Sequence, residues 1–357
     1  LHATIQPDNP TAPTASWMNT VDLALSDSSF TLDGDEVKPI DIEAHARINQ
    51  TRAEIRDITL RSPVAETHLQ GTMDDWRAAR YQLQVHSTID LTQISDTFKP
   101  ATPLRGAGVF DGTVTGEGAH YKVEGEVKSD ALAAGDVRLR GLQLTATTTG
   151  DAHTNQYDAQ GRAVAEMLTA GSFNLNLVQL RGGVMGTGAD FRFIGELRAA
   201  AARSGETSIA SLMLADAVAE SRDGELSASA SRATAGTFTN GATRISGIQA
   251  NGLRFNGKDK NNFNASATSI TTGAITNGKD TKINGVSAGN VTATGHNGVT
   301  DVATNNVRVN GGTIAGAQVG SLNIAGVRLA IHDNGRIEGS TSDLNVGTVA
   351  FTRDGMK

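Results

Sequence analysis

One stretch of the sequence has the pattern of a catalytic nucleophile: Gly-x-Ser-x-Gly at residues 285 to 289, with Ser287 at its centre. In serine hydrolases this pattern joins a strand to a helix, and the serine needs a histidine and an acid beside it. No apolar helical pattern follows Gly289, because "NVTATGHNGVTDVATN" reads as strand, turn and strand. We therefore predict that Gly285 forms a bend or bulge, that no residue is catalytic, and that the chain is not an enzyme.

Other residues that could take part in catalysis or metal binding also lack the partners that such sites need. The eight histidines form neither a His-x-His nor a His-x-x-x-His pair, and there is no cysteine to supply thiolate ligands. Residues 106 to 112 approach a phosphate-binding loop in composition, but the glycine spacing is wrong and no helical pattern follows. Asp74 and Asp75 are typical of a turn before Trp76. The sequence thus predicts no metal site and no cofactor.

Composition favours β structure and excludes several classes of protein. Only 4% of residues are aromatic, 40 are glycine, and Thr, Asn and Ser are abundant, which is typical of strands joined by many turns. A net charge of −7 argues against binding to nucleic acid. No run of about 18 apolar residues is present. Because the chain starts at Leu1, we expect a piece of a longer protein or a processed one.

Alternation of apolar and polar residues predicts the strands. It is clear in residues 81–85, 173–177 and 191–193, and a period of two gives a strand one apolar and one polar face. Residues 90–98, with Asp90 as a cap, predict a short helix before Pro100. Residues 197–220 also alternate and favour strand over helix. The proline-rich residues 1–16 predict a linker or an extended segment.

The last third of the sequence repeats itself. Gly236-Thr237-Phe238-Thr239-Asn240-Gly241 recurs at residues 273–278 and, altered, at 312–316. A second landmark follows each copy, at residues 245–248, 283–286 and 324–327. Units of about 37–39 residues that cannot bury their own apolar face must stack on their neighbours. We predict two or three antiparallel strands in each unit, linked by Asn-Gly-type turns.

Residues 71–144 carry a resemblance to a known group. They contain Gly-x-x-x-x-Trp before the Tyr81 strand, then "LRGAGVFDGTVTGEG", "YKVEG" and "LAAGDVRLRGLQL". This order resembles the AsmA and TamB group of bacterial envelope proteins. The resemblance implies an elongated, repetitive sheet curled into a groove with an apolar interior (a β-taco). It also implies phospholipid transport between membranes and outer-membrane assembly in the periplasm.

These observations combine into one expectation about architecture. We expect an all-β, mainly antiparallel curled sheet with at most one or two short helices. Residues 17–222 would form the AsmA/TamB-like segment, and residues 223–357 the repeats that continue the same sheet. Expected partners are phospholipid acyl chains and either the membrane-anchored remainder of the parent chain or an outer-membrane protein. Candidate groove-lining residues, for which ordinary core packing is the alternative, are Phe173, Leu175, Leu177, Phe191, Phe193, Leu322, Ile324, Leu329 and Ile331.

A second reading comes from a different class of protein. Richness in Gly, Asn and Thr, with no cysteine and no proline after Pro103, also suits a secreted or cell-surface β-solenoid adhesin of the autotransporter type. A solenoid predicts a filled core and coils of about 20 to 30 residues. The groove predicts antiparallel hairpins and an apolar surface open to lipid.

Overall fold

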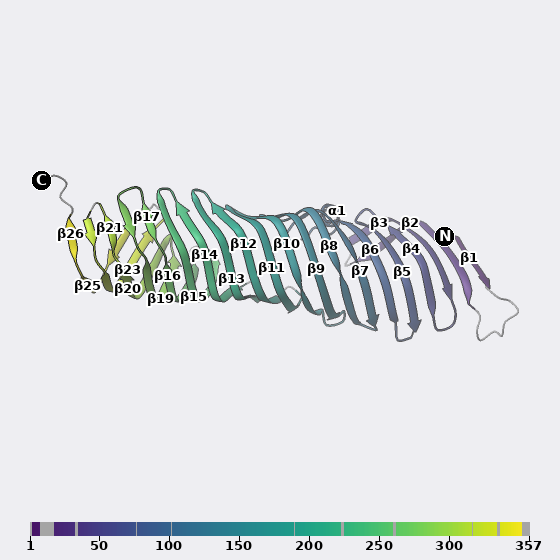
Figure 1. Ribbon diagram of the computed structural model, residues 1–357. Helices are drawn as coiled ribbons and strands as arrows, with labels where there is room; N and C mark the ends of the chain where they lie inside the picture. Colours follow the sequence, from purple (N-terminus) through teal and green to yellow (C-terminus); the bar gives the residue numbers. More distant parts are fainter. Residues whose placement is uncertain are drawn as a thin grey trace. The chain divides into compact units, whose positions relative to one another are not determined.

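The computed structural model describes residues 2–7, 18–32, 35–75, 77–100, 102–188, 190–222, 225–259, 262–315, 317–333 and 336–351. Within these ranges the protein has 26 strands and one short helix, and the strands belong to one sheet. Every strand pairing in the described part is antiparallel, and β1 pairs only with β2, so the sheet stays open. The predicted all-β, antiparallel curled sheet is confirmed (Figure 1).

The chain divides into two compact units. Unit 1 comprises residues 1–171 and 183–188. Its strands follow one another as hairpins, and one helix, α1 (Leu91–Phe98), lies between β6 and β7. Its strands are β1 (His2–Pro7), β2 (Asn19–Leu32), β3 (Asp35–Ile48), β4 (Ala53–Arg61), β5 (Ala65–Asp75), β6 (Arg80–Asp90), β7 (Leu104–Glu117), β8 (His120–Ala134), β9 (Val137–Asp151) and β10 (Gln156–Ala170).

Unit 2 comprises residues 172–182 and 189–357, so β11 (Phe173–Thr187) has residues in both units. Its first strands are long and its later ones are broken into shorter pieces. They are β12 (Asp190–Ser204), β13 (Thr207–Arg222), β14 (Glu225–Asn240), β15 (Thr243–Asp259), β16 (Asn262–Thr272), β17 (Ile275–Asn277), β18 (Thr281–Ile283), β19 (Val286–His296), β20 (Val299–Val309), β21 (Gly312–Ile314), β22 (Ala317–Val319), β23 (Leu322–His332), β24 (Ile337–Ser340), β25 (Asp343–Val346) and β26 (Val349–Phe351).

The shorter strands of unit 2 are interrupted at matching places on neighbouring strands. The interruption between β16 and β17 lies opposite Ser246 of β15, and the N–H of Ser246 donates to the carbonyl of Ala274 at 2.9 Å. The break between β18 and β19 pairs in the same way with the break between β20 and β21, where the N–H of Asn284 donates to the carbonyl of Gly311 at 2.9 Å. Gly285 has φ +149° there, so the predicted bend is confirmed.

A second row of irregular positions explains the period of the repeat. Asp216, Gly252, Asn290 and Gly326 all have left-handed backbones, with φ between 48° and 59°. In each case the carbonyl just before this residue accepts a hydrogen bond from a nearby serine or threonine hydroxyl, in the next strand for the first three and from Ser342, between β24 and β25, for Gly326. The hydroxyl supplies a partner for a carbonyl where the backbone ladder is interrupted. Each repeat is therefore one antiparallel hairpin with one left-handed position and one hydroxyl.

The third copy of the second landmark does not occupy the expected place. Residues 324–327 lie within β23, and Gly326 belongs to the row of left-handed positions. The strand break that matches Asn284-Gly285 is at Gly320-Ser321, between β22 and β23. The glycine of the break, Gly320, lies six residues before Gly326.

Other local predictions have clear outcomes. The helix is present as α1, and Asp90 caps it by accepting from the N–H groups of Thr92 and Gln93. Residues 197–220 are strand, in β12 and β13. Within the predicted linker, His2–Pro7 forms β1, and residues 8–16 lie outside the described residues. The boundary at 222/223 stays a prediction.

Candidate functional site

Each strand has one polar and one largely apolar face. In β6 the side chains of Tyr81, Leu83, Val85 and Ile89 are half-buried, whereas the intervening Gln82, Gln84 and His86 are exposed. Directly opposed residues of antiparallel strands point to the same face, so the pairing register extends each face from strand to strand. Side chains along a strand alternate between the two faces, and a bulge, which adds one residue, reverses that alternation. Where the apolar pattern in the sequence also shifts by one residue, the apolar side chains stay on the same face beyond the bulge.

The apolar face of unit 2 brings together six of the nine predicted residues. Phe193 and Leu329 belong to one cross-strand row, which runs Phe193, Ala219, Ala228, Phe255, Ala265, Ala293, Val302, Leu329. Phe191 and Ile331 belong to the neighbouring row, with Leu226 and Phe263 between them. Ile324 ends a row that begins at Leu197 and Leu214, and Leu322 pairs with Val309.

This face has a small-residue centre and large side chains toward its rim. Ala217, Ala230, Ala250 and Ala267 are buried, with 7 to 8% of their surface exposed. By contrast, exposed fractions are 44% for Leu226, 38% for Ile331 and 36% for Phe191. Large apolar side chains at these values are only half removed from water, so a partner that covered them would gain hydrophobic free energy. The apolar face therefore has the character of a binding surface for an apolar partner.

The total surface area leads to the same conclusion. The chain exposes 21910 Å². A compact protein of 37.1 kDa exposes about 13,600 Å². Among the described residues, no large side chain is completely removed from water. The protein thus buries less surface than a compact protein of the same mass does.

The other three predicted residues lie on β11. Phe173 and Leu177 are 60% and 59% exposed, and Leu175 is half-buried. Leu177 has a left-handed backbone with φ +49°, so the simple alternation ends there and the next residue, Val178, is buried. Of these three residues, only Leu175 is thus half-buried.

Ser287 has none of the surroundings of a nucleophile. It lies inside β19, opposite Thr271 on one side and Arg308 on the other, and β20 follows after a turn. Gln249, which the repeat places in the same position, also pairs with Thr271. Residues 106–112 are likewise part of a strand, β7. In the described part of the chain, no three metal-ligating side chains gather around one point.

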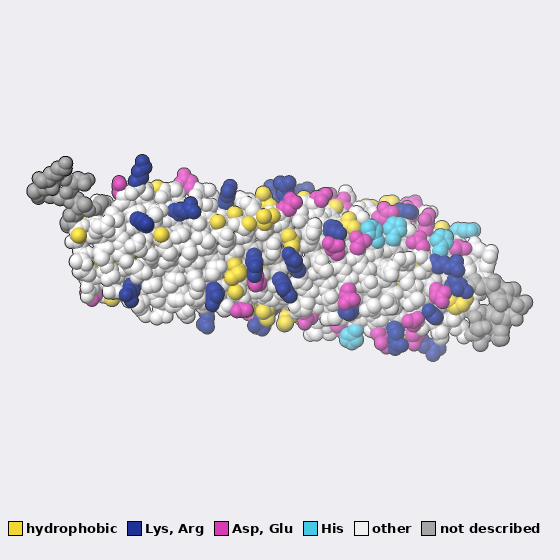
Figure 2. All heavy atoms as spheres, in the orientation of Figure 1, with side chains coloured by type: hydrophobic (Ala, Val, Ile, Leu, Met, Phe, Trp, Pro, Cys, Tyr) yellow, Lys and Arg dark blue, Asp and Glu magenta, His cyan; other side chains and the backbone are white. Residues whose placement is uncertain are grey.

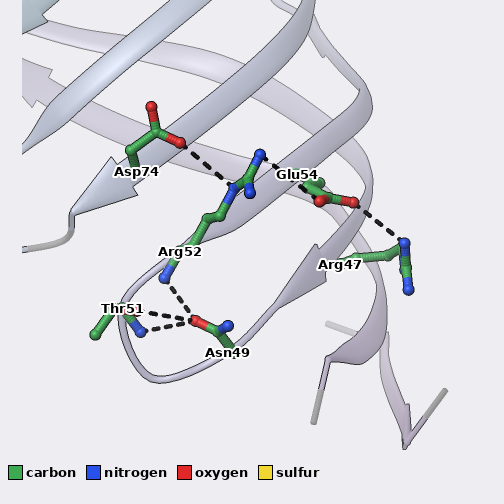
Figure 3. Close-up of polar contacts among 6 residues, drawn as sticks. All are labelled: Arg47, Asn49, Thr51, Arg52, Glu54 and Asp74. Atoms are coloured by element: carbon green, nitrogen blue, oxygen red, sulfur yellow. Dashed lines mark hydrogen bonds and ion pairs between the residues drawn. The ribbon is translucent and has the colours of Figure 1, made fainter. Parts of the chain in front are cut away.

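Asp74 and Asp75 have separate structural roles at the ends of hairpins. Asp74 forms an ion pair of 3.4 Å with Arg52, which also lies 3.8 Å from Glu54 (Figure 3). In the turn between β3 and β4, Asn49 accepts hydrogen bonds from the N–H groups of Thr51 and Arg52. Asp75 accepts hydrogen bonds from the N–H groups of Arg77 and Ala78. Both bonds lower the pKa of Asp75, and the bond from Arg77 has the larger effect. The prediction that Asp74 and Asp75 themselves form a turn was wrong, because both lie at the end of β5 and the turn comprises residues 77–79.

The polar face of unit 1 holds an arrangement that sequence analysis missed. Asp22, His45 and Asp57 are successive cross-strand partners on β2, β3 and β4, and His68, His86 and Asp111 are successive partners on β5, β6 and β7. Figure 2 shows histidine side chains beside acidic ones over these strands. The hydrogen bond with Asp22, 2.7 Å long, raises the pKa of His45. Only the strand register reveals these partners, because 23 and 18 residues separate successive histidines in the sequence.

Fold and surface together define an all-β protein of one curled, open sheet with a partly exposed apolar face. Comparisons with protein-family models, curated proteins and solved structures find no match. Among the described residues, the single helix is too short to cross a membrane.

Proposed function

We propose that this chain is a non-catalytic segment of a bacterial envelope protein. Its apolar face carries phospholipid acyl chains between membranes and serves outer-membrane assembly in the periplasm. The observation that supports this most is that the apolar face of β12 to β23 leaves large side chains half-exposed, among them Phe191, Leu226 and Ile331. Exposed apolar patches on soluble proteins often mark the binding site of a ligand or partner.

The strand arrangement favours this proposal over the β-solenoid. Coils of a β-solenoid stack in parallel around a filled core. Here neighbouring strands are antiparallel hairpins, and the most buried positions hold mainly alanine. The proposal assigns no role to nucleic acid, in agreement with the net charge of −7. The protein partner in this proposal is the membrane-anchored remainder of the parent chain or an outer-membrane protein.

Photo-crosslinking tests the proposal directly. A photoreactive amino acid replaces Leu175 or Ile324, and the protein is incubated with vesicles of phosphatidylethanolamine and phosphatidylglycerol. We expect lipid crosslinks at Ile324, and native mass spectrometry should show co-purified phospholipid. Asn323, the neighbouring exposed residue on the opposite face of β23, is the matched control. A protein that purifies without lipid and crosslinks at neither Leu175 nor Ile324 would refute the proposal.

A further inference from the structure

Two histidines lie opposite each other on the polar face of unit 1. His68 of β5 and His86 of β6 are direct cross-strand partners, and their ring centroids are 6.4 Å apart. Imidazole nitrogens are common ligands of divalent transition metals. Two opposed histidines on neighbouring strands can therefore contribute to one metal site, provided that each ring has a nitrogen free to bind.

A carboxylate orients the ring of His86. Its Nδ1 is hydrogen-bonded to Oδ1 of Asp111, which is its cross-strand partner on β7. An ionised carboxylate only accepts hydrogen bonds, so Nδ1 is the ring nitrogen that carries the proton. In the neutral ring the lone pair then belongs to Nε2. A histidine whose Nδ1–H is held by a carboxylate in this way is the usual form of a histidine ligand in metal sites.

A buried hydroxyl holds the ring of His68. Oγ1 of Thr59, the cross-strand partner of His68 on β4, lies 3.0 Å from Nδ1 of His68. Thr59 is only 4% exposed, so the sheet fixes its position. Because Nδ1 is bonded to Thr59, Nε2 is the nitrogen of His68 that is left for another partner.

A second carboxylate lies beside that nitrogen. Glu66 precedes His68 by two residues on β5 and shares its face, and its Oε1 is 3.5 Å from Nε2 of His68. A good N–H···O hydrogen bond is shorter, about 2.7–3.2 Å. Two ligands of one tetrahedral zinc ion, each about 2.1 Å from the metal, are about 3.4 Å apart. The oxygen and the nitrogen therefore have the spacing of two ligands of one ion. Glu66 also accepts from Nε of Arg61 at 3.2 Å, which leaves the carboxylate further acceptor positions.

The surroundings of the two histidines favour a cation. Three carboxylates lie around the rings, those of Asp57, Glu66 and Asp111. Arg61 supplies one positive charge beside them. The excess of negative charge attracts a divalent ion. A hollow of about 590 Å³ offers room for it, and its lining includes Asp57, His68, Gln70, Gln84, His86 and Asp111.

We propose that His68, His86 and Glu66 bind a divalent transition-metal ion of the zinc, nickel and copper class. Nε2 of each ring and the carboxylate of Glu66 are the ligands, and water takes the remaining position. In the described part of the chain no three ligating side chains surround one point. Two imidazoles on one zinc ion have centroids about 5 Å apart, so the rings must approach each other by about 1 Å. A small rotation of the exposed His86 side chain achieves this approach. Such a site goes beyond the proposed lipid function and does not depend on it.

Zinc binding to the whole chain tests the proposal. Competition with a chromophoric zinc chelator should show a Zn²⁺ site that His68→Gln and His86→Gln each weaken by about tenfold or more. His120→Gln is the matched control. His120 also lies beside a carboxylate, 3.1 Å from Asp151, but its cross-strand partners are Glu117 and Asp151, not a histidine. Its loss should leave the zinc affinity unchanged.

Two further measurements separate the ligands from their surroundings. Asp111→Asn should weaken zinc binding about tenfold, because it removes the carboxylate that orients His86. Electron paramagnetic resonance of the parent protein with Cu²⁺ should show two coordinating imidazole nitrogens, and that of His86→Gln only one. The parent spectrum needs no variant, so it remains informative if a variant folds poorly. Mg²⁺ should not compete, because it prefers oxygen ligands.

Three results would overturn the proposal. One is a zinc affinity that is equal in the parent protein and in both histidine variants. Another is a parent Cu²⁺ spectrum with fewer than two imidazole nitrogens. The third is a loss of zinc binding in His120→Gln as large as that in His86→Gln, which would locate the ion elsewhere. Absence of lipid crosslinks at Ile324 would refute the proposed function and leave the metal site standing.

Discussion

At the scale of single residues, the three tyrosines of the chain form one row with two glycines. Tyr81, Gly116, Tyr121, Gly150 and Tyr157 are successive cross-strand partners from β6 to β10. A Cβ atom on Gly116 would lie 2.4 Å from the ring of Tyr81, and one on Gly150 would lie 2.3 Å from the hydroxyl oxygen of Tyr121. Each ring therefore covers a glycine of the next strand, which restores packing that the glycine lacks.

A first prediction follows from this row. Gly150→Val would force the Tyr121 ring away and crowd the carbonyl of Gln156, so we expect a loss of about 1–3 kcal/mol in the free energy of unfolding. Gly108→Ala is the control, because its Cβ meets the carbonyl of Lys128 at 3.5 Å and Cγ1 of Val127 at 4.0 Å, both ordinary contacts. Urea denaturation measures both. Equal losses for the two variants would contradict the role assigned to the tyrosine ring.

The pair of His45 and Asp22 gives a prediction about pH. Asp22 raises the pKa of His45 from its ordinary 6.5, mainly through their hydrogen bond, and Asp57 and Glu43 add to the effect. A group with a higher pKa in the folded state stabilises folding at low pH and loses this contribution as pH rises through the folded pKa. Asp22→Asn should therefore lower the pKa of His45 in an NMR titration. It should also destabilise the protein more at pH values below 6.5 than in the alkaline range.

At the scale of elements, α1 depends on its cap. Asp90→Ala removes the acceptor for the N–H groups of Thr92 and Gln93, which lie 2.9 and 3.0 Å from its carboxylate oxygen. We expect a loss of about 1 kcal/mol. Hydrogen exchange at residues 91–98 should become faster, while exchange in β12 and β13 stays the same. The exposed Asp96→Ala is the control, and an equal acceleration there would argue against a capping role.

The left-handed positions of unit 2 give a matched pair of variants. A Cβ on Gly252 would lie 2.7 Å from the hydroxyl of Thr268, and its φ of +59° disfavours any branched side chain. Gly252→Val should therefore cost about 1–3 kcal/mol. Asn290→Gly should be close to neutral, because Asn290 has the same left-handed backbone, with φ +51°. Thermal melting distinguishes these outcomes. A large loss for Asn290→Gly would show that its side chain matters more than its backbone.

Left-handed and related backbone positions also recur outside the visible repeats. Positive φ occurs at Gly71, Gly106, Gly141, Leu177, Ser211, Gly247 and Gly285, in steps of 35, 35, 36, 34, 36 and 38 residues. One such position thus occurs on every second long strand. The two-strand period covers far more of the chain than the sequence repeat does, because a positive φ recurs while the residue type changes.

At the scale of the whole molecule, charge differs between the units. Unit 1 has 14 Lys and Arg against 24 Asp and Glu, a formal charge of −10, and unit 2 has 17 against 14, a charge of +3. Many charges of unit 1 form ion pairs between or within strands, such as Arg80 with Glu117 at 2.9 Å. Exposed pairs of this kind contribute little to stability. Their main effect is to keep the polar face of the sheet in water.

Burial predicts how the molecule responds to denaturant. Folding removes about 32,000 Å² of surface from water, against about 40,000 Å² for a compact chain of the same mass. The urea m-value, summed over all transitions, should therefore be about four-fifths of the value for a compact protein of this size. Phospholipid bound to the folded state should raise the melting temperature. An m-value equal to that of a compact protein would contradict this picture of burial.

The sequence by itself determined the strands, the helix and the bend at Gly285. These features follow from local physics: alternation, an acidic cap, and a residue without a side chain. Only the tertiary structure decided which residues meet, because strand register depends on hydrogen bonds between residues that are distant in the sequence. It placed Phe193 and Leu329 in one row, paired His68 with His86 and His45 with Asp22, and placed residues 324–327 at a left-handed position within β23. Ser287 shows the difference most simply. The residues around it in the sequence match the pattern of a nucleophile, whereas in the structure it pairs with Thr271 and Arg308 on the two neighbouring strands.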